Sequence, residues 1–172
     1  MEKTIVLRFR DLSVEKGGTI AEHANLLNQY GEVWWGWWMK QDETSPKELF
    51  RELANKIQTK GSLSAFLFDS GYKQLYSTDV SKILISPTGR ISTPDPEKSP
   101  SYYHRGTYPA WLLLRSLKRV NFEDFKFTYE SFPTRPELSA SYQEFIGKNI
   151  PSLDQMKQFD ITLWVVEVEK QI

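Results

Sequence analysis

The sequence contains no cysteine and only two histidines. Without cysteine there is no disulfide, no thiolate metal ligand and no cysteine nucleophile. His23 and His104 are too far apart in the sequence to form the HExxH type of metal site, and neither has a second histidine at ligand spacing. There is also no GxSxG motif and no glycine-rich phosphate loop. We therefore expect no metal and no cofactor, and we lean towards a protein that is not an enzyme.

The sequence also lacks net charge and long apolar runs. Lysine and arginine together number 22, as do aspartate and glutamate, so the formal charge is zero. This balance argues against a general duplex-DNA binder, whose affinity comes from phosphate neutralisation, but not against binding one nucleotide or a short single strand. No stretch approaches the roughly 20 apolar residues of a membrane span, and the first residues lack the apolar run of a signal peptide. We expect a cytoplasmic protein with no membrane contact.

Two helices are predicted from their start and stop signals. Thr19-Ile-Ala-Glu22 has the pattern of a capping box, and the helix that it opens is predicted to end at Gly31. Ser45-Pro-Lys-Glu48 is a second capping box with proline at the first helical position, and that helix is predicted to end at Gly61.

Strands are predicted from alternation of apolar and polar residues. In the first of them Ile5, Leu7 and Phe9 share one face, while Arg8 and Arg10 give the other face a basic outer or cleft character. The predicted strands cover residues 4–11, 33–40, 64–68, 72–76, 80–86, 108–120, 126–132 and 161–168.

This order of elements lacks the regular alternation of a doubly wound sheet. The length of 172 residues favours a single domain over residues 1–172. We expect an α+β fold with a curved, mostly antiparallel sheet or partly closed pseudo-barrel and two main flanking helices. The residues expected together in one core are Ile5, Leu7, Phe9, Leu53, Ile57, Phe66, Phe68, Leu113, Trp164 and Val166.

The most unusual stretch is Glu32–Lys40, which contains four of the six tryptophans. In an extended strand Trp35 and Trp37 share one face, and Gly36 leaves a notch on the other face. A glycine inside a strand often marks the close approach of a ligand or of another backbone. Two interpretations stay open: the rings are core or edge packing, or an indole stacks on a flat heteroaromatic ligand.

Residues 87–106 contain four prolines and are predicted to form a long loop that is functional or mobile. Its last part, Tyr102-Tyr-His-Arg-Gly106, is the one cluster with acid–base potential. There Arg105 is suited to phosphate contact and His104 to general-acid chemistry. The loop overlaps an acid-free basic block at 98–122, which supplies cations to a ligand or is simply a solvated strand face.

A family resemblance is carried by Tyr108-Pro-Ala-Trp111 and the apolar strand and cations that follow it. This segment resembles the corresponding part of EVE-like domains of the PUA superfamily. The resemblance implies a small pseudo-barrel that binds RNA or a flipped, modified base in an aromatic pocket. The first 60 residues are also similar to accessory segments beside calcineurin-like phosphoesterase domains in bacterial proteins, and this similarity implies a protein partner such as a phosphoesterase. No phosphoesterase motif occurs in the chain itself.

Three functions stay open. The first is a non-catalytic binding module for a nucleotide, a modified base or a short single-stranded nucleic acid. The second is a small metal-independent nuclease or nucleotide hydrolase that uses His104 with Arg105 and a lysine such as Lys40. The third is a protein-interaction module whose exposed tryptophans meet a partner. No catalytic residue is assigned, and the predicted ligand-binding residues are Trp34, Trp35, Trp37, Trp38, Lys40, Tyr103, His104, Arg105, Trp111 and Arg115.

Overall fold

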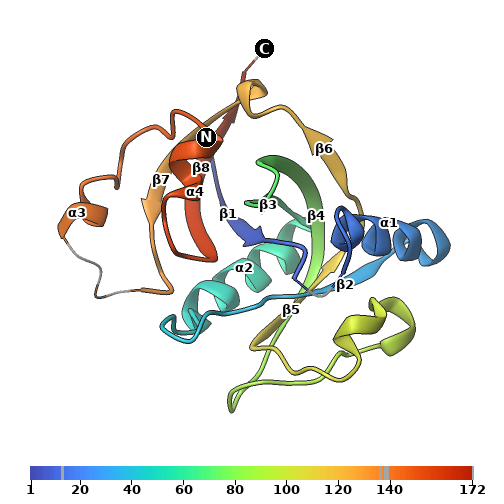
Figure 1. Ribbon diagram of the computed structural model, residues 1–172. Coiled ribbons are helices and arrows are strands. Elements are labelled where there is room, and N and C mark those ends of the chain that lie inside the picture. Colours follow the sequence, from blue (N-terminus) through green and yellow to red (C-terminus); the bar gives the residue numbers. More distant parts are fainter. Residues whose placement is uncertain (13, 136, 138–139, 172) are drawn as a thin grey trace.

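A mixed, curved β-sheet forms the framework of the computed structural model, which describes residues 1–12, 14–135, 137 and 140–171 (Figure 1). The strands are β1 (Glu2–Phe9), β2 (Val33–Gly36), β3 (Leu63–Asp69), β4 (Gln74–Ile85), β5 (Ala110–Leu114), β6 (Lys118–Val120), β7 (Phe125–Ser131) and β8 (Leu163–Lys170). Their order is β2-β5-β4-β3-β1-β8-β7, and β6 pairs with β4.

Antiparallel pairing dominates the sheet. β1 pairs in parallel with β3, and every other strand pair between described residues is antiparallel. The helices are α1 (Gly18–Tyr30), α2 (Lys47–Lys60), α3 (Ala140–Gln143) and α4 (Leu153–Lys157). The first two are the main ones, so the predicted α+β architecture with a curved, mostly antiparallel sheet is confirmed.

The predicted capping box at the start of α1 is wrong. The helix begins after Gly17, which has a φ of 76°, and Thr19 lies inside the first turn. The carboxylate of Asp11 accepts hydrogen bonds from the backbone N–H groups of Gly17 at 2.8 Å and Thr19 at 3.1 Å. The glycine pair lets the chain turn back, so a carboxylate from the preceding segment satisfies the free amides of the helix start.

The start of α2 also differs from the prediction. Pro46 is the N-cap, and no side chain among the described residues caps this helix. Ser45 instead accepts a hydrogen bond from the backbone N–H of Lys47 through its carbonyl oxygen at 3.0 Å. The predicted ends are confirmed, because the N–H groups of Gly31 and Gly61 bond back into the last turns of α1 and α2.

Three strand predictions differ from the structure. The strand expected at 33–40 covers Val33–Gly36 alone, and residues 37–40 continue outside the strand. The segments expected at 72–76 and 80–86 are parts of one long strand, β4, which contains a register irregularity between Val80 and Lys82. The segment expected at 108–120 is instead divided into β5 and β6, which both pair with β4. The break lies at Ser116, whose carbonyl oxygen accepts a hydrogen bond from the Thr78 hydroxyl at 2.6 Å.

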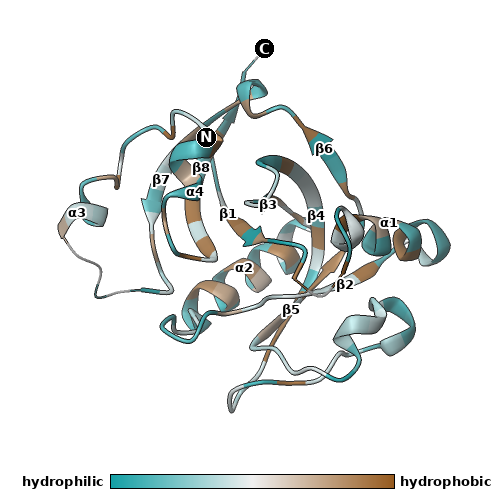
Figure 2. Cartoon of the chain, viewed as in Figure 1, coloured by the Kyte–Doolittle hydropathy of each residue, from teal (hydrophilic) through white to brown (hydrophobic). Residues whose placement is uncertain are grey.

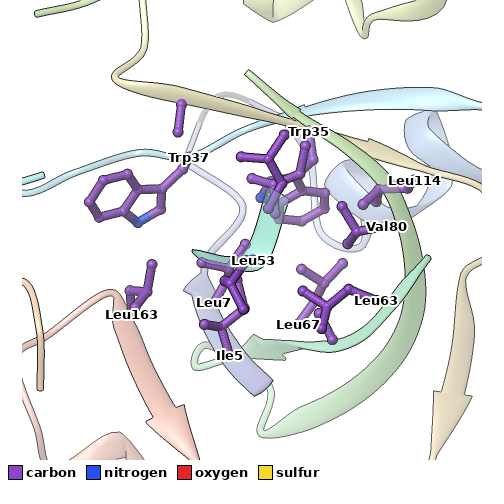
Figure 3. Packing of buried hydrophobic residues seen from close by; sticks show 14 of the residues in the cluster. Ile5, Leu7, Trp35, Trp37, Leu53, Leu63, Leu67, Val80, Leu114 and Leu163 are labelled. Carbon is purple, nitrogen blue, oxygen red and sulfur yellow. The ribbon is translucent and has the colours of Figure 1, made fainter. Parts of the chain in front are cut away.

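The sheet is buried on both faces, so the prediction of a single core is wrong. On one face Ile5 and Leu7 of β1 pack with Leu53 and Ile57 of α2. Figure 3 shows Ile5, Leu7 and Leu53 grouped beneath two tryptophans. Val6 belongs to a second cluster on the other face. In Figure 2 the hydrophobic colour on α2 alternates with hydrophilic bands, as expected of a helix with one buried side.

The remaining predicted core residues divide between these faces. Phe66, Phe68, Trp164 and Val166 lie in the second cluster, Leu113 lies in a third cluster with Trp34, and Phe9 is a partly buried neighbour of the first.

Candidate functional site

A cavity of about 170 Å³ lies where the ends of β1 and β2 meet the start of α1 and the last part of the 87–106 loop. Seven of its twelve lining residues are aromatic, and Arg8 and Arg10 are the charged residues among those lining it. The cavity, called here the aromatic cavity, is lined by Arg8, Phe9, Arg10, Leu12, Thr19, Trp35, Gly36, Trp37, Trp38, Tyr102, Tyr103 and Tyr108.

Trp35 is fixed in the wall of the aromatic cavity by its neighbours. Its ring centroid lies 4.5 Å from that of His23 in α1 and 5.1 Å from that of Phe9, which it meets edge to face. His23 is fully buried, and its Nδ1 lies 2.7 Å from the carbonyl oxygen of Thr19. Burial lowers the pKa of His23 to about 4, so the imidazole is neutral near pH 7. The wall that it supports is therefore uncharged.

Trp37 is held by a hydrogen-bond network centred on the buried carboxylate of Glu43. The Trp37 Nε1–H donates to the Thr162 hydroxyl oxygen at 3.1 Å, and that hydroxyl donates to Glu43 Oε1 at 2.7 Å. Glu43 Oε2 accepts from the Thr162 backbone N–H at 3.1 Å and from the Thr134 hydroxyl at 2.5 Å. These bonds fasten the chain after β2 to the segment before β8 and hold this side of the cavity in place.

The opposite face of the tryptophan segment is filled by the protein itself. Trp34 and Trp111 are buried there together with Tyr103, whose hydroxyl donates to the Gly36 carbonyl oxygen at 3.3 Å. A Cβ built on Gly36 would lie 3.0 Å from the Trp111 ring and 3.1 Å from the Tyr108 ring. The predicted notch at Gly36 therefore exists, but aromatic side chains of this chain occupy it.

Two exposed apolar residues border the aromatic cavity. Trp38 is 49% exposed and Leu12 is 60% exposed, whereas the other three tryptophans of the segment are each at most 5% exposed. A ring that is half in solvent and half against a cavity has a free face for stacking.

The two arginines of the cavity differ in their contacts. Arg8 is half-buried, and its Nη1 donates to the carbonyl oxygens of Phe159 and, at 3.2 Å, Lys157. Burial lowers the pKa of the Arg8 guanidinium, and the charge of Arg10 acts in the same direction. Arg10 is exposed, and within the described part of the chain it forms no salt bridge.

A second cavity of about 150 Å³ adjoins the first and shares five of its lining residues. Its own lining residues are more polar, and it is called here the polar cavity. Lys40 and Asp160 form an ion pair at its wall. The residues that line only the polar cavity are Lys40, Ser70, Asp160 and Thr162.

The sequence matches the profile of the Pua-like family over residues 5–172. The chain belongs to the Pua-like family. The comparison with curated proteins and the comparison with solved structures each found no match. Membership of the Pua-like family confirms the PUA superfamily resemblance and supports a domain of the RNA- or nucleotide-binding type.

In this Pua-like chain the predicted site residues fall into three groups. Trp35, Trp37, Trp38 and Tyr103 line the aromatic cavity, and Lys40 lines the polar cavity. Trp34 and Trp111 lie on the opposite face of the segment.

The third group lies outside both cavities. His104 is exposed, and its Nε2 lies 2.8 Å from the Pro96 carbonyl oxygen and 3.0 Å from that of Ser99. Arg115 forms an ion pair with Glu32 at 3.7 Å. Arg105 is exposed and does not line either cavity.

Several lining residues were absent from the predicted site. Arg8 and Arg10 had a usable signal, because strand alternation placed both on a basic outer or cleft face. Phe9 was assigned to the core, and it reaches the cavity because β1 ends there. Tyr108 begins the segment that carries the family resemblance, but it was not named as a site residue; an isolated bridge to Ile91 positions it, and that pairing has no local sequence signal.

Two features are absent from the part of the chain that the structure describes. No group of three or more histidine, aspartate or glutamate side chains among them is arranged to hold a metal ion. None of the helices that the structure describes has the length and apolar character needed to cross a membrane.

Proposed function

We propose that this protein is a non-catalytic binding module that takes one unpaired base of a nucleotide or short single-stranded nucleic acid into the aromatic cavity. The observation that carries the proposal is the composition of that cavity, with seven aromatic residues and two arginines among twelve lining residues. Aromatic rings stack on the flat face of any base, and arginine attracts the anionic backbone.

The size of the cavity limits what enters it. Its volume of about 170 Å³ is small beside the roughly 300–1,000 Å³ of sites for drug-sized ligands. A single ring system fits this scale better than a larger cofactor does. A base inside a duplex is stacked and paired, so a concave site of this kind requires a base that is single-stranded or turned out of the helix.

Preorganisation also supports a binding role. Trp35 is packed against His23 and Phe9, and Trp37 is tied to Thr162, so these rings lose little freedom when a ligand arrives. Trp38 is the exposed member of the segment and has a face available to the ligand.

A protein-interaction role is the second candidate. It is favoured by the exposure of Trp38 and Leu12, which both line the aromatic cavity. Tryptophan is enriched in interface hot spots, and a phosphoesterase partner belongs to this alternative. Because the other three tryptophans of the segment are buried, the exposed aromatic surface there is one ring, which is little for a stable protein interface. The nuclease alternative receives no comparable support, since His104 lies outside both cavities.

The test is a titration of the wild type, Trp38→Ala and Tyr72→Ala with short single-stranded RNA, single-stranded DNA and mononucleotides. Tyr72 is a matched control, because it is 44% exposed but lines neither cavity. Stacking of a base on an aromatic ring contributes roughly 1–3 kcal/mol, so Trp38→Ala is expected to weaken binding by about 5- to 150-fold.

Tyr72→Ala is expected to bind like the wild type. Equal affinity of folded Trp38→Ala and wild type for every ligand that binds would contradict the stacking role. A wild type that binds none of these ligands would refute the proposed function and leave the protein-interaction role as the better account.

A further inference from the structure

We propose that the polar cavity binds the phosphate of the same nucleotide whose base occupies the aromatic cavity. This inference rests on the proposed function and deepens it, because it makes the preferred ligand a nucleotide rather than a free base or nucleoside. It also assigns the phosphate contact to Arg10 and Lys40, not to the basic block at 98–122.

The first argument is continuity. The aromatic and polar cavities share five lining residues, among them Arg10 and Trp38, so one ligand can extend from one cavity into the other. Each cavity alone is too small for a whole nucleotide, and only together do they approach the lower end of the roughly 300–1,000 Å³ range of ligand sites. The change from aromatic to polar walls follows the change from base to phosphate along a nucleotide.

The second argument is charge. Arg8, Arg10 and Lys40 line the polar cavity with one carboxylate, Asp160, although the whole chain has a formal charge of zero. A local excess of positive charge in a concave site attracts an anion. Arg10 is exposed and has no salt-bridge partner within the described residues, so its guanidinium fork is available for bidentate phosphate contact.

The third argument concerns the ion pair at the wall of the polar cavity. Lys40 pairs with Asp160, and the two side chains are 28% and 63% exposed. The backbone N–H of Lys40 donates to Glu43 Oε1 at 3.1 Å, which fixes the base of the lysine side chain near the cavity. In this arrangement the Asp160 carboxylate pairs with the Lys40 ammonium group, which is the group that a phosphate would contact. Phosphate and Asp160 therefore compete for Lys40.

The start of α1 is not available for the phosphate, although it borders the aromatic cavity. The Asp11 carboxylate already accepts hydrogen bonds from the amides of Gly17 and Thr19 there. A second anion at that position would be repelled by Asp11. The cationic side of the polar cavity is therefore the place where the phosphate is best satisfied.

The experiment compares a nucleoside with its 5′- and 3′-monophosphates by calorimetric titration at low and physiological salt. The wild type is expected to bind one or both monophosphates about tenfold more tightly than the nucleoside, and this difference should shrink as salt rises. Using both phosphate positions identifies which end of the nucleotide lies in the polar cavity.

Three variants and one control give the inference a distinctive signature. Arg10→Gln and Lys40→Gln are each expected to lower monophosphate affinity by about two- to fivefold. Lys40 lines only the polar cavity, so Lys40→Gln is also expected to leave nucleoside affinity unchanged, whereas Arg10 lines both cavities and its variant is compared on the ratio of the two affinities. Asp160→Asn is expected to raise monophosphate affinity by a similar factor, because it removes the competing carboxylate. Arg105→Gln is the control, since Arg105 is an exposed cation outside both cavities.

The outcomes separate the inference from the proposed function. Equal wild-type affinity for nucleoside and monophosphates overturns the inference and leaves base binding in place. Loss of monophosphate affinity in Arg105→Gln but not in Arg10→Gln also overturns it. If the folded wild type binds no nucleoside, nucleotide or single strand, the proposed function itself fails and the inference fails with it.

Discussion

The two faces of the tryptophan segment differ in what covers them. On one face Trp34 and Trp111 are covered by Tyr103 and by the loop that carries it. On the other face Trp35 and Trp37 belong to the first core cluster, and both line the aromatic cavity together with Trp38, which follows the end of β2. The same residue type therefore builds a closed core on one side and the wall of a cavity on the other.

This difference shows how a chain of this size accommodates so many rings. Burying indoles on both faces of one strand needs cover on both sides, and the 87–106 loop supplies the second cover through its aromatic end. The closed face is expected to determine stability and the cavity face to determine binding. The predictions below test this division.

The largest expected effect is on stability at the closed face. Trp111 is fully buried, and its Nε1–H donates to the Ile91 carbonyl oxygen at 3.0 Å. Trp111→Ala should lower the free energy of unfolding by about 3–5 kcal/mol, because it leaves a large cavity and removes one of the two hydrogen bonds to the Ile91 carbonyl oxygen, which keeps the bond from the Tyr108 N–H. Chemical denaturation measures this change.

Trp38→Ala is the matched comparison on the cavity face. Because Trp38 is 49% exposed, its replacement should change the free energy of unfolding by about 1 kcal/mol or less. Equal destabilisation by the two variants would break the division between the faces.

A second effect is a dependence of stability on pH through His23, which supports Trp35. Burial lowers the pKa of His23 to about 4, against about 6.5 for an unfolded histidine. The unfolded state therefore binds a proton more readily than the folded state does. Protonation of His23 in the unfolded state therefore leaves the free energy of unfolding unchanged above about pH 6.5. As the pH falls from there towards 4, the free energy of unfolding decreases progressively, by about 3 kcal/mol at most.

Denaturation midpoints between pH 7 and 5 measure this dependence in the wild type and in His104→Ala, which should keep it. An NMR titration of the His23 ring gives an independent readout, with no protonation expected above about pH 5. Titration of His23 near pH 6.5 would show that the wall beside Trp35 is open to water.

The smallest effect separates the two interpretations of Gly36. A Cβ there would press on the Trp111 and Tyr108 rings at 3.0 and 3.1 Å, so Gly36→Ala should destabilise the fold by about 1–3 kcal/mol. Nucleotide affinity of the folded variant should stay within about twofold of wild type, because the added methyl group meets the Trp111 and Tyr108 rings and not that of Trp38. Strongly reduced affinity with unchanged stability would instead favour a ligand in the Gly36 notch.

Local patterns in the sequence were enough to predict the sheet, the two main helices and the glycines that end them. They were not enough for the start of α1, because the capping carboxylate of Asp11 acts across a turn that no capping-box pattern describes. They also led to the wrong prediction of a single core. Alternation in β1 assigns residues to two faces, but it does not show that both faces are covered by other elements.

The candidate site was predicted in part for the same reason. The tryptophan segment was visible as a local cluster, and three of its tryptophans line the aromatic cavity, as does Tyr103 of the predicted set. The cations were sought in the acid-free block, but Glu32 pairs with both Lys98 and Arg115 of that block. Arg8 and Arg10 reach the rings only because the curved sheet brings the end of β1 to the end of β2, and that closeness has no local sequence signal.

The most direct test of base binding in the aromatic cavity is an NMR titration of the six tryptophan indole N–H signals, assigned with single tryptophan-to-phenylalanine variants. On addition of the short RNA, DNA or mononucleotide that binds most tightly, the signals of Trp35, Trp37 and Trp38 should shift most. Those of Trp34, Trp111 and Trp164 should change little. A ligand that binds but shifts Trp34 and Trp111 most would place the site on the opposite face and contradict the account.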